Sequence, residues 1–432
     1  MGAALKPLLK RLAVGSPAAL PTLDLDFLAQ TYRVSDGAGG MSSVAFADLI
    51  TFTRSSAAWR FNASGLLEVV PANQPRFDYD PVTLALRGLL VEEQRTNLLT
   101  RSSDFTNAVW QKNDTTISSD GTLAPDGSAM PLLTQGSDAA SALILAGALT
   151  ITSGQTMTRS SFLKRGNHDW VRISIADSTF ANGAAVWVNL ATGVLGTIAN
   201  LGTGTGASAT IQNCGSGIYR VSVTGTIPAT LCNSSTVGVA ANGATNRVSG
   251  GTRYEWLSQI EVGSFSTSPI PTAGSQVTRA ADVASVNTLS PWFNSVAGTI
   301  YAEWDASGGL ATNSPVWVLQ GSGTNIIRQR AEAARPLFDV YTDGVAQASI
   351  SVGAPVVAGV TRKTAAAWML NSFQAAADGS LGAPDTSGSI PSVTQLAFVK
   401  ANVTAASFNG HIRRIRYWPR RLFDNELQRI TA

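Results

Sequence analysis

The chain has 432 residues, enough for two or three domains at roughly 150 residues each. Charged residues make up only 14%, against a usual share of about 25%, while glycine occurs 40 times; this composition is typical of short strands joined by turns and argues against helix bundles and coiled coils. The net charge of +3 is too small to indicate a nucleic-acid or membrane-surface partner.

The N-terminal part of the chain has no regular pattern. Residues 1–20 predict at most one short basic helix, because leucines recur there at helical spacing before two prolines. Residues 23–95 carry scattered strand-like pieces and are expected to fold against a neighbour. No stretch has a signal-peptide core or the roughly 18 apolar residues of a membrane span, so we expect a protein made in the cytoplasm without membrane insertion.

From residue 96 to about 280 the pattern changes to strict alternation with turn residues between the runs. Two neighbouring runs each place three aliphatic side chains on one face: Val171, Ile173 and Ile175 in the first, and Val186, Val188 and Leu190 in the second. Alternation of this kind predicts half-buried antiparallel strands. Residues 96–280 are therefore expected to form a jelly roll.

A second all-β block is predicted for residues 285–432, with strands at TIYAEWDA, PVWVLQ, PLFDVYTDG and HIRRIRYW. It ends in one short helix from Asp424 to Ile430, with Asp424 as the expected N-cap and Glu426 in the first turn. The expected fold class is thus all-β: two tandem antiparallel β-sandwiches behind an irregular N-terminal segment of residues 1–95.

Metal and redox motifs are scarce. His168 and His411 are far apart and neither has a metal-binding spacing. Cys214 and Cys232 cannot form a disulfide framework or a zinc site, and we interpret both as reduced thiols. Three aspartates in a turn-rich stretch could offer oxygen ligands to calcium, but without the spacing of a calcium loop they are better explained as turn residues: Asp114, Asp120 and Asp126. No metal and no cofactor is therefore expected.

One strand resembles a glycosidase motif but lacks half of it. Glu303-Trp304-Asp305 matches the start of a Glu-x-Asp-x-(x)-Glu strand, yet Ala, Ser, Gly and Gly follow where the second glutamate should stand. Without a partner carboxylate a double displacement cannot run. We expect an outward polar edge on a strand whose inward residues include Ile300, Ala302 and Trp304, and no enzymatic activity.

The candidate binding residues are aromatic. If the aliphatic residues of the two alternating runs are buried, strand register places Trp170, Arg172, Trp187 and Asn189 together on the opposite face. Indole rings stack on the C–H faces of sugars, and a guanidinium and an amide can bond the hydroxyl groups. This predicts a glycan platform. The same face could equally be a second buried layer or a subunit interface.

Several segments resemble one protein family. PRFDYDPVTLALRGLLVEEQRTNLLTRSSDFTNAVWQK at residues 75–112 resembles bacteriophage and prophage tail or virion proteins, and ITFTRSS at 50–56 and SFSTSPIPTAGSQVTRAADVASV at 264–286 continue the likeness. Between these segments the chain is similar to jelly rolls of carbohydrate-binding modules. FNGHIRRIRYWPRRL at 408–422 looks like part of a concanavalin A-like or laminin G-like domain.

The resemblance implies a virion location after assembly in the host cytoplasm. It implies that residues 1–95 attach the chain to other virion proteins, so deleting them should leave folded sandwiches. The leading hypothesis is a non-enzymatic tail-fibre, tail-tip or similar appendage protein that contacts host-surface polysaccharide, as a homo-oligomer because weak sugar sites gain from multivalency. The alternatives are a purely structural tail or capsid decoration protein and a polysaccharide depolymerase. The family motif assigns no sugar-binding residue.

Overall fold

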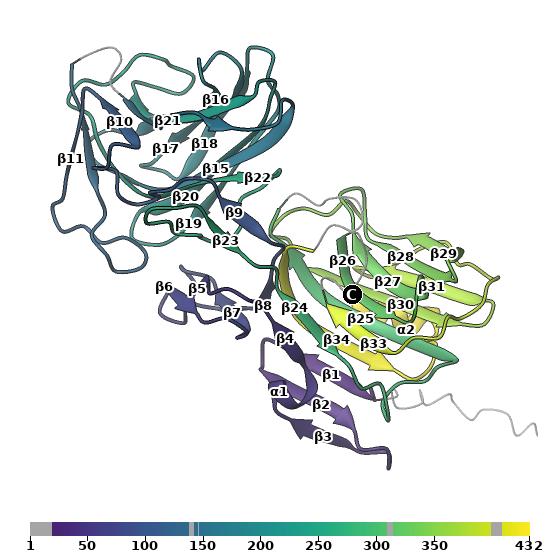
Figure 1. The fold of residues 1–432 in the computed structure, drawn as a ribbon. Coiled ribbons are helices and arrows are strands. Elements are labelled where there is room, and N and C mark those ends of the chain that lie inside the picture. Colours follow the sequence, from purple (N-terminus) through teal and green to yellow (C-terminus); the bar gives the residue numbers. More distant parts are fainter. Residues whose placement is uncertain (1–19, 138–141, 146, 309–313, 399–407) are drawn as a thin grey trace, which may run out of the picture.

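The computed structural model describes residues 20–137, 142–145, 147–308, 314–398 and 408–432. These residues form two antiparallel β-sandwiches, which confirms the expected all-β class (Figure 1). The described part of the chain contains two helices, α1 (Phe46–Leu49) and α2 (Asp424–Thr431). Neither is long or apolar enough to cross a bilayer.

The C-terminal sandwich consists of two sheets. Sheet 1 has the main order β3 (Met41–Val44), β2 (Thr31–Ser35), β1 (Leu23–Asp26), β34 (Gly410–Trp418), β25 (Ala297–Ala306), β30 (Arg362–Met369), β31 (Ser372–Ala377) and β32 (Ser380–Leu381). Two further strands join it through β34: β8 (Leu86–Val91) and, paired with β8, β7 (Arg76–Tyr79). Sheet 2 has the order β29 (Val345–Ser351), β28 (Leu337–Thr342), β27 (Ile326–Ala331), β26 (Ser314–Gln320), β33 (Gln395–Phe398), β24 (Val283–Val286) and β4 (Thr51–Thr53).

The jelly roll also has two sheets. Sheet 3 contains β10 (Trp110–Asn113), β13 (Ala142–Leu145), β21 (Leu231–Val239), β16 (Trp170–Asp177), β17 (Gly183–Asn189) and β18 (Val194–Leu201), with β14 (Leu149–Thr150) on β21. Sheet 4 contains β11 (Thr115–Ser118), β12 (Leu132–Gln135), β22 (Thr252–Val262), β15 (Gln155–Arg165), β20 (Ile218–Ile227) and β19 (Thr205–Asn213). The six aliphatic residues predicted to face inward on β16 and at β17 are all in the jelly-roll core, as expected from their alternation.

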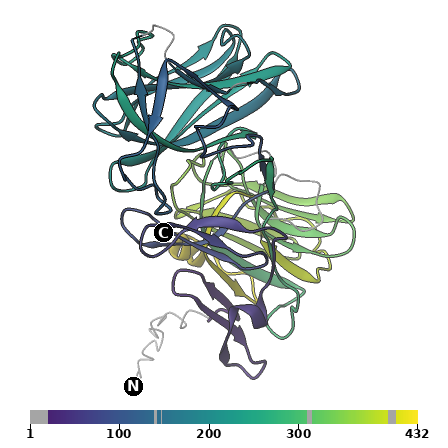
Figure 2. The same cartoon turned by 60° about the vertical axis from the view of Figure 1, so that its left-hand side comes forward.

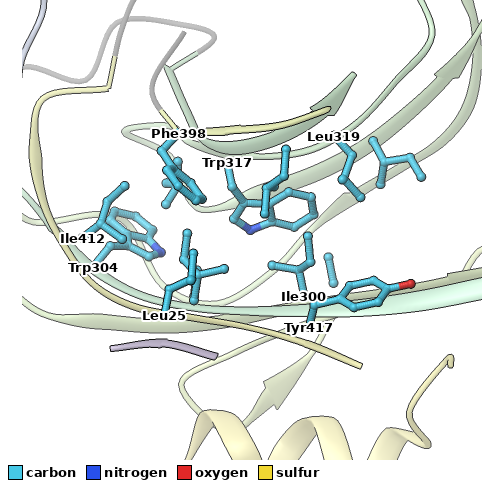
Figure 3. Packing of buried hydrophobic residues seen from close by; sticks show 14 of the residues in the cluster. Leu25, Ile300, Trp304, Trp317, Leu319, Phe398, Ile412 and Tyr417 are labelled. Atoms are coloured by element: carbon cyan, nitrogen blue, oxygen red, sulfur yellow. The ribbon is translucent and has the colours of Figure 1, made fainter. Parts of the chain in front are cut away.

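The N-terminal segment is part of the C-terminal sandwich. Strand β1 pairs with β34, β4 pairs with β24, and β8 pairs with β34. Leu25 of β1 lies in the core beside Trp304 and Ile412 (Figure 3). Residues 20–95 therefore do not form a segment apart from the sandwiches, which differs from the expectation, because their irregular strands are completed by partners more than 190 residues away.

The same segment also contacts the jelly roll. Its hairpin of β5 (Ala58–Phe61) and β6 (Leu67–Val70) buries Phe61 and Leu67 against Phe162 and Trp256 on sheet 4. The backbone N–H of Leu67 donates to the carbonyl of Pro125 at 2.9 Å. Residues 20–95 thus contact both sandwiches and connect one to the other.

The jelly roll is an insertion in the C-terminal sandwich. The chain leaves the C-terminal sandwich along β9 (Arg95–Asn97) and returns to it along β23 (Val277–Arg279). These two strands pair with each other. Figures 1 and 2 show the resulting two lobes, with β7 and the β5–β6 hairpin near their junction. The limits expected from the sequence, near 95 and 280, coincide with the two ends of this insertion.

The last helix confirms one prediction and corrects another. Helix α2 begins at Asp424, but its N-cap is Phe423, which has no side-chain acceptor. The backbone N–H of Phe423 donates to Glu426 Oε2 at 2.9 Å, so half of a capping box is present. Asp424 is therefore the first helical residue, where its charge favours the positive end of the helix dipole.

Candidate functional site

A buried cluster of charged side chains lies where the jelly roll joins the C-terminal sandwich. Its members are between 0 and 4% exposed: Arg54, Arg76, Glu92, Arg279 and Asp282. Asp282 accepts hydrogen bonds from Arg54 at 3.0 Å and from Arg76 at 2.5 Å. Although burial opposes its ionisation, Arg279 and Arg76 hold the pKa of Glu92 well below the usual range of a glutamate.

The segments that carry the family resemblance meet in this cluster. ITFTRSS contributes Arg54, PRFDY contributes Arg76, and GLLVEE contributes Glu92. The segment 264–286 contributes Asp282 and also Ser268, whose backbone N–H and hydroxyl bond Glu92 at 2.7 and 2.6 Å. These motifs therefore stabilise the junction between the two sandwiches.

A cavity of about 510 Å³ lies beside the cluster. Its wall comes from β5, β7 and β8 of the N-terminal segment, from β19 and β20 of the jelly roll, and from β34 of the C-terminal sandwich. Pockets of roughly 300–1,000 Å³ at domain interfaces are the usual place for small ligands. We call this space the junction cavity and treat it as the candidate site.

His411 sits in the cavity wall between two carboxylates. Its Nδ1 lies 2.9 Å from Asp305 Oδ1 and its Nε2 lies 3.0 Å from Asp78 Oδ2. Because carboxylate oxygens accept hydrogen bonds, this geometry favours a ring that is protonated on both nitrogens. Burial alone would lower the pKa of His411, but the two carboxylates outweigh burial and raise it. Neither nitrogen has a lone pair left for taking a proton from a substrate.

Two arginines converge on the same carboxylate. Arg413 on β34 donates to Asp305 Oδ2 at 3.1 Å, and Arg87 on β8 reaches Asp305 Oδ1 at 3.4 Å. The close pairing of β8 with β34 requires Gly88. Its φ is +122°, and an added Cβ would stand 2.5 Å from the carbonyl oxygen of Ile412. Asp305 is fully buried, whereas the two guanidinium side chains are 23% and 24% exposed.

The rest of the cavity wall combines aromatic side chains, Trp59 and Phe61, with hydroxyl groups. Trp59 on β5 is partly buried and lines the cavity. Thr83, Thr210 and Ser266 add hydroxyl groups to the wall. Asp80 accepts the backbone N–H groups of Val82 and Thr83 at 3.0 and 2.8 Å, and these bonds help to lower its pKa against the effect of burial.

The four residues of the predicted glycan platform are adjacent on the non-core face of sheet 3. Trp170 pairs with Asn189, and Arg172 pairs with Trp187. The Trp187 ring is only 6% exposed, because its Nε1–H donates to the carbonyl of Ala244 at 2.7 Å in the segment that follows β21. The expected open Trp187 ring is therefore absent. Sugar binding by these four residues stays a prediction.

The other residues of that platform have local partners. The Arg172 guanidinium lies 5.2 Å from the centre of the Trp187 ring, and the Asn189 side chain accepts the N–H groups of the turn that follows it. Trp170 remains partly buried. The face thus resembles the second buried layer that the sequence left open as an alternative.

The sequence predicts Asp305 at an outward polar edge of its strand, but the structure buries this side chain. Ile300, Ala302 and Trp304 do face the core, as predicted, and Asp305 points to the other side of sheet 1. It is nevertheless fully buried there, in contact with His411, Arg87 and Arg413. Glu303, two residues earlier, accepts the hydroxyl of Tyr301 at 3.2 Å.

The remaining polar candidates have ordinary surroundings. Asp120 accepts the hydroxyl of Tyr254 at 2.5 Å, and Asp126 accepts the N–H of the turn residue Ser128 at 2.9 Å. Within the described ranges no group of His, Cys, Asp or Glu side chains is placed to hold a metal ion. Cys214 and Cys232 are buried separately, and burial raises the pKa of each thiol to about 12.

Reasoning from the sequence missed the residues of the junction cavity. Asp78 and His411 are 333 positions apart, and Arg87 lies 218 positions from Asp305. Only the register of β8 against β34 brings them together, and that pairing has no local signal. One hint was the pair of charged residues two positions apart on a single strand, Glu303 and Asp305.

Comparisons with known proteins give weak matches. No protein-family model and no curated protein matches the chain. Among solved structures, the Ruminococcus gnavus IT-sialidase CBM40 bound to α2,3 sialyllactose is 20% identical, with 32% of this chain and 84% of that chain covered at a TM-score of 0.29. Mouse laminin α1 domains LG4-5 are 12% identical over 64% and 85%, at 0.24. Trypanosoma rangeli sialidase in complex with the inhibitor DANA is 8% identical over 70% and 66%, at 0.28. Likenesses at these scores carry no weight for function.

Proposed function

We propose that the chain is a non-enzymatic bacteriophage virion protein, of a tail fibre, tail tip or similar appendage, that contacts host-surface glycans through the junction cavity. The observation that supports glycan contact is the cavity wall, where one indole ring stands among guanidinium, carboxylate and hydroxyl groups. The virion setting rests on the sequence resemblance of residues 50–56, 75–112 and 264–286.

The chemistry of the wall suits a sugar. A pyranose ring offers C–H groups to an aromatic face and hydroxyl groups at its rim that both donate and accept. Trp59 supplies the aromatic surface, Arg87 and Arg413 supply donors, and Asp80 supplies an acceptor. An aromatic surface with a few placed polar groups is the general form of a small-ligand site.

The state of the carboxylates supports binding without hydrolysis. Hydrolysis of a glycosidic bond needs one protonated carboxyl group as the acid and a second as nucleophile or base. Asp80 and Glu92 both have lowered pKa values, and Glu92 is enclosed by Arg76, Arg279 and Ser268. His411 is occupied on both nitrogens. These groups are suited to holding a ligand.

The test compares two tryptophans. The affinity of purified host-surface polysaccharide is measured for the wild type and for Trp59→Ala and Trp170→Ala, with unfolding midpoints as a check on folding. Weakened binding for Trp59→Ala alone supports the junction cavity. Weakened binding for Trp170→Ala alone would move the site to sheet 3. Release of reducing ends from the polysaccharide would contradict the non-enzymatic assignment.

A second candidate is a purely structural tail or capsid decoration protein. The observation that favours it is the position of the family motifs, whose side chains build the buried junction. For the glycan-contacting role we propose a homo-oligomer, since several weak sugar sites on one particle give high avidity. Labelling of the protein on intact particles separates the two roles: a distal position favours glycan contact, and a position between other virion proteins favours decoration.

A further inference from the structure

We propose that the junction cavity is selective for saccharides that carry a carboxylate, and that Arg87 and Arg413 bind this group. This inference rests on the proposed function and deepens it by naming the chemical class of the ligand. It starts from an imbalance of charge around Asp305.

Three cations share the single negative charge of Asp305. His411 donates to its Oδ1, Arg87 reaches the same oxygen at 3.4 Å, and Arg413 donates to Oδ2. His411 has a second carboxylate, Asp78, while Arg87 has no other ion pair or hydrogen bond through its guanidinium within the described ranges. The two arginines therefore carry more positive charge than the carboxylate beneath them can offset.

The exposed part of this group is positive. Asp305 is covered, whereas the side chains of Arg87 and Arg413 are each about a quarter exposed and line the cavity. A ligand that enters meets the two guanidinium groups and not the carboxylate. Guanidinium groups present paired N–H donors that match the two oxygens of a carboxylate.

The jelly-roll part of the cavity wall adds another cation. Arg220 on β20 lines the cavity, and its charge lies over the ring of Phe162 at 5.5 Å. Its guanidinium hydrogen bond in the part of the chain that the structure describes goes to the neutral hydroxyl of Ser160, and its Nε has no partner there. Burial lowers the pKa of Arg220, although Glu261 and Glu92 act in the opposite direction.

The carboxylates of the wall do not cancel this surplus. Glu92 is bound by Arg76 and Ser268, and Asp78 is bound by His411 and by the N–H of Phe61. Asp80 accepts the backbone N–H groups of Val82 and Thr83 and also attracts Arg87 electrostatically. Each of these carboxylates thus already has its own donors. An anionic ligand group would complete the partners of the arginines without displacing an existing pair.

The experiment uses small acids as probes of the full chain. Signals of the arginine side-chain N–H groups are followed by NMR during titration with D-glucuronate, N-acetylneuraminate, D-glucose and inorganic sulfate. We expect saturable shifts of the Arg87 and Arg413 signals with at least one of the two acids and none with glucose. The absence of shifts with both acids well above millimolar concentration would overturn the proposal, as would equal shifts with sulfate.

Variants provide the matched control. Arg87→Gln with Arg413→Gln should weaken binding of a carboxylated host polysaccharide at least about tenfold, which corresponds to about 1.4 kcal/mol. Arg414→Gln is the control, because Arg414 is the next residue, is 27% exposed and is also paired with aspartates, but lies outside the cavity wall. If the double variant does not fold, the wild type decides the question: carboxyl reduction of the polysaccharide should abolish its binding.

The outcomes separate this inference from the proposed function. Suppose that the native and the carboxyl-reduced polysaccharide bind equally and that Trp59→Ala weakens both. This result would support the glycan site and contradict its selectivity for a carboxylate. Shifts of the arginine signals with small acids, without binding of any host polysaccharide, would support the carboxylate site and contradict the proposed contact with host glycans.

Discussion

Arg76 and Asp282 form a fully buried ion pair, with Nη2 and Oδ2 2.5 Å apart and 206 positions between the two residues. Arg76 also binds Glu92, and Asp282 also binds Arg54, so one strand of the N-terminal segment and the start of β24 are held together by charges. The ion pair thus joins the chain segment that precedes the jelly-roll insertion to the segment that follows it.

Removing the charge of Asp282 should therefore destabilise the protein strongly. Asp282→Asn leaves Arg54 and Arg76 buried without their shared carboxylate, and breaking one partner of a buried pair costs about 3–5 kcal/mol. Denaturant unfolding measures this loss. Asp169→Asn is the control: its partner Arg165 is 48% exposed, and the expected change is below about 1 kcal/mol. A loss for Asp282→Asn as small as for the control would contradict the role of the cluster.

Deletion of residues 1–95 should unfold the C-terminal sandwich. The deletion removes β1, β4 and β8 together with the fully buried side chains of Leu23, Leu25, Phe27, Leu89 and Val91. At about 1.5–3 kcal/mol for each, this loss is comparable to the whole stability of a domain. Near-ultraviolet circular dichroism of residues 96–432 should show loss of ordered aromatic packing.

The jelly roll should fold alone as residues 98–276. All strands of sheets 3 and 4 lie inside this range, and its ends meet at the paired strands β9 and β23. A cooperative thermal transition of this fragment is the expected result. A folded 96–432 chain beside an unfolded 98–276 fragment would contradict the assignment of residues 20–95 to the C-terminal sandwich.

The stability should fall as the pH rises above about 6.5. His411 has a raised pKa in the folded protein, so its contribution is complete below the unfolded value and is lost as the pH rises through the folded value. The loss is at most about 1.4 kcal/mol per pH unit. Asp305 and Asp78 favour the charged ring, and Arg87 opposes it.

The comparison with His411→Gln isolates this contribution. Both proteins contain the buried thiols of Cys214 and Cys232, so the effects of these groups at high pH cancel in the difference. The free energy of unfolding of the wild type should fall more steeply between pH 6.5 and 8.5 than that of the variant. Parallel curves would show that His411 is neutral in the folded state.

Trp187→Ala should destabilise the jelly roll by about 3–5 kcal/mol, because the ring is buried and its N–H is bonded to Ala244. Trp170→Ala should cost less, since Trp170 is only partly buried. An open platform with both rings on the outer face, as the sequence predicts, would instead leave the melting temperature nearly unchanged when Trp170 and Trp187 are both replaced by alanine. Thermal unfolding of the two single variants measures these losses. An unchanged midpoint for Trp187→Ala would contradict the buried ring and support the open ring that the sequence predicts.

Local patterns predicted the parts of the fold that depend on neighbours in the chain. Val171 and Val188 face each other across a hairpin, so alternation on each strand was enough to place them. Trp187 lies on the predicted face, but Ala244, which accepts its Nε1–H, lies 57 positions later in the chain. Asp78, Arg87 and His411 meet only through strand pairings over more than 300 residues, which no local pattern predicts.

The most direct test of the account is a crystal structure with an oligosaccharide prepared from the host-surface polysaccharide. The account predicts density for a sugar ring in the junction cavity, against Trp59 and within hydrogen-bond distance of Arg87 or Arg413. Density on sheet 3 beside Trp170, with an empty junction cavity, would contradict it.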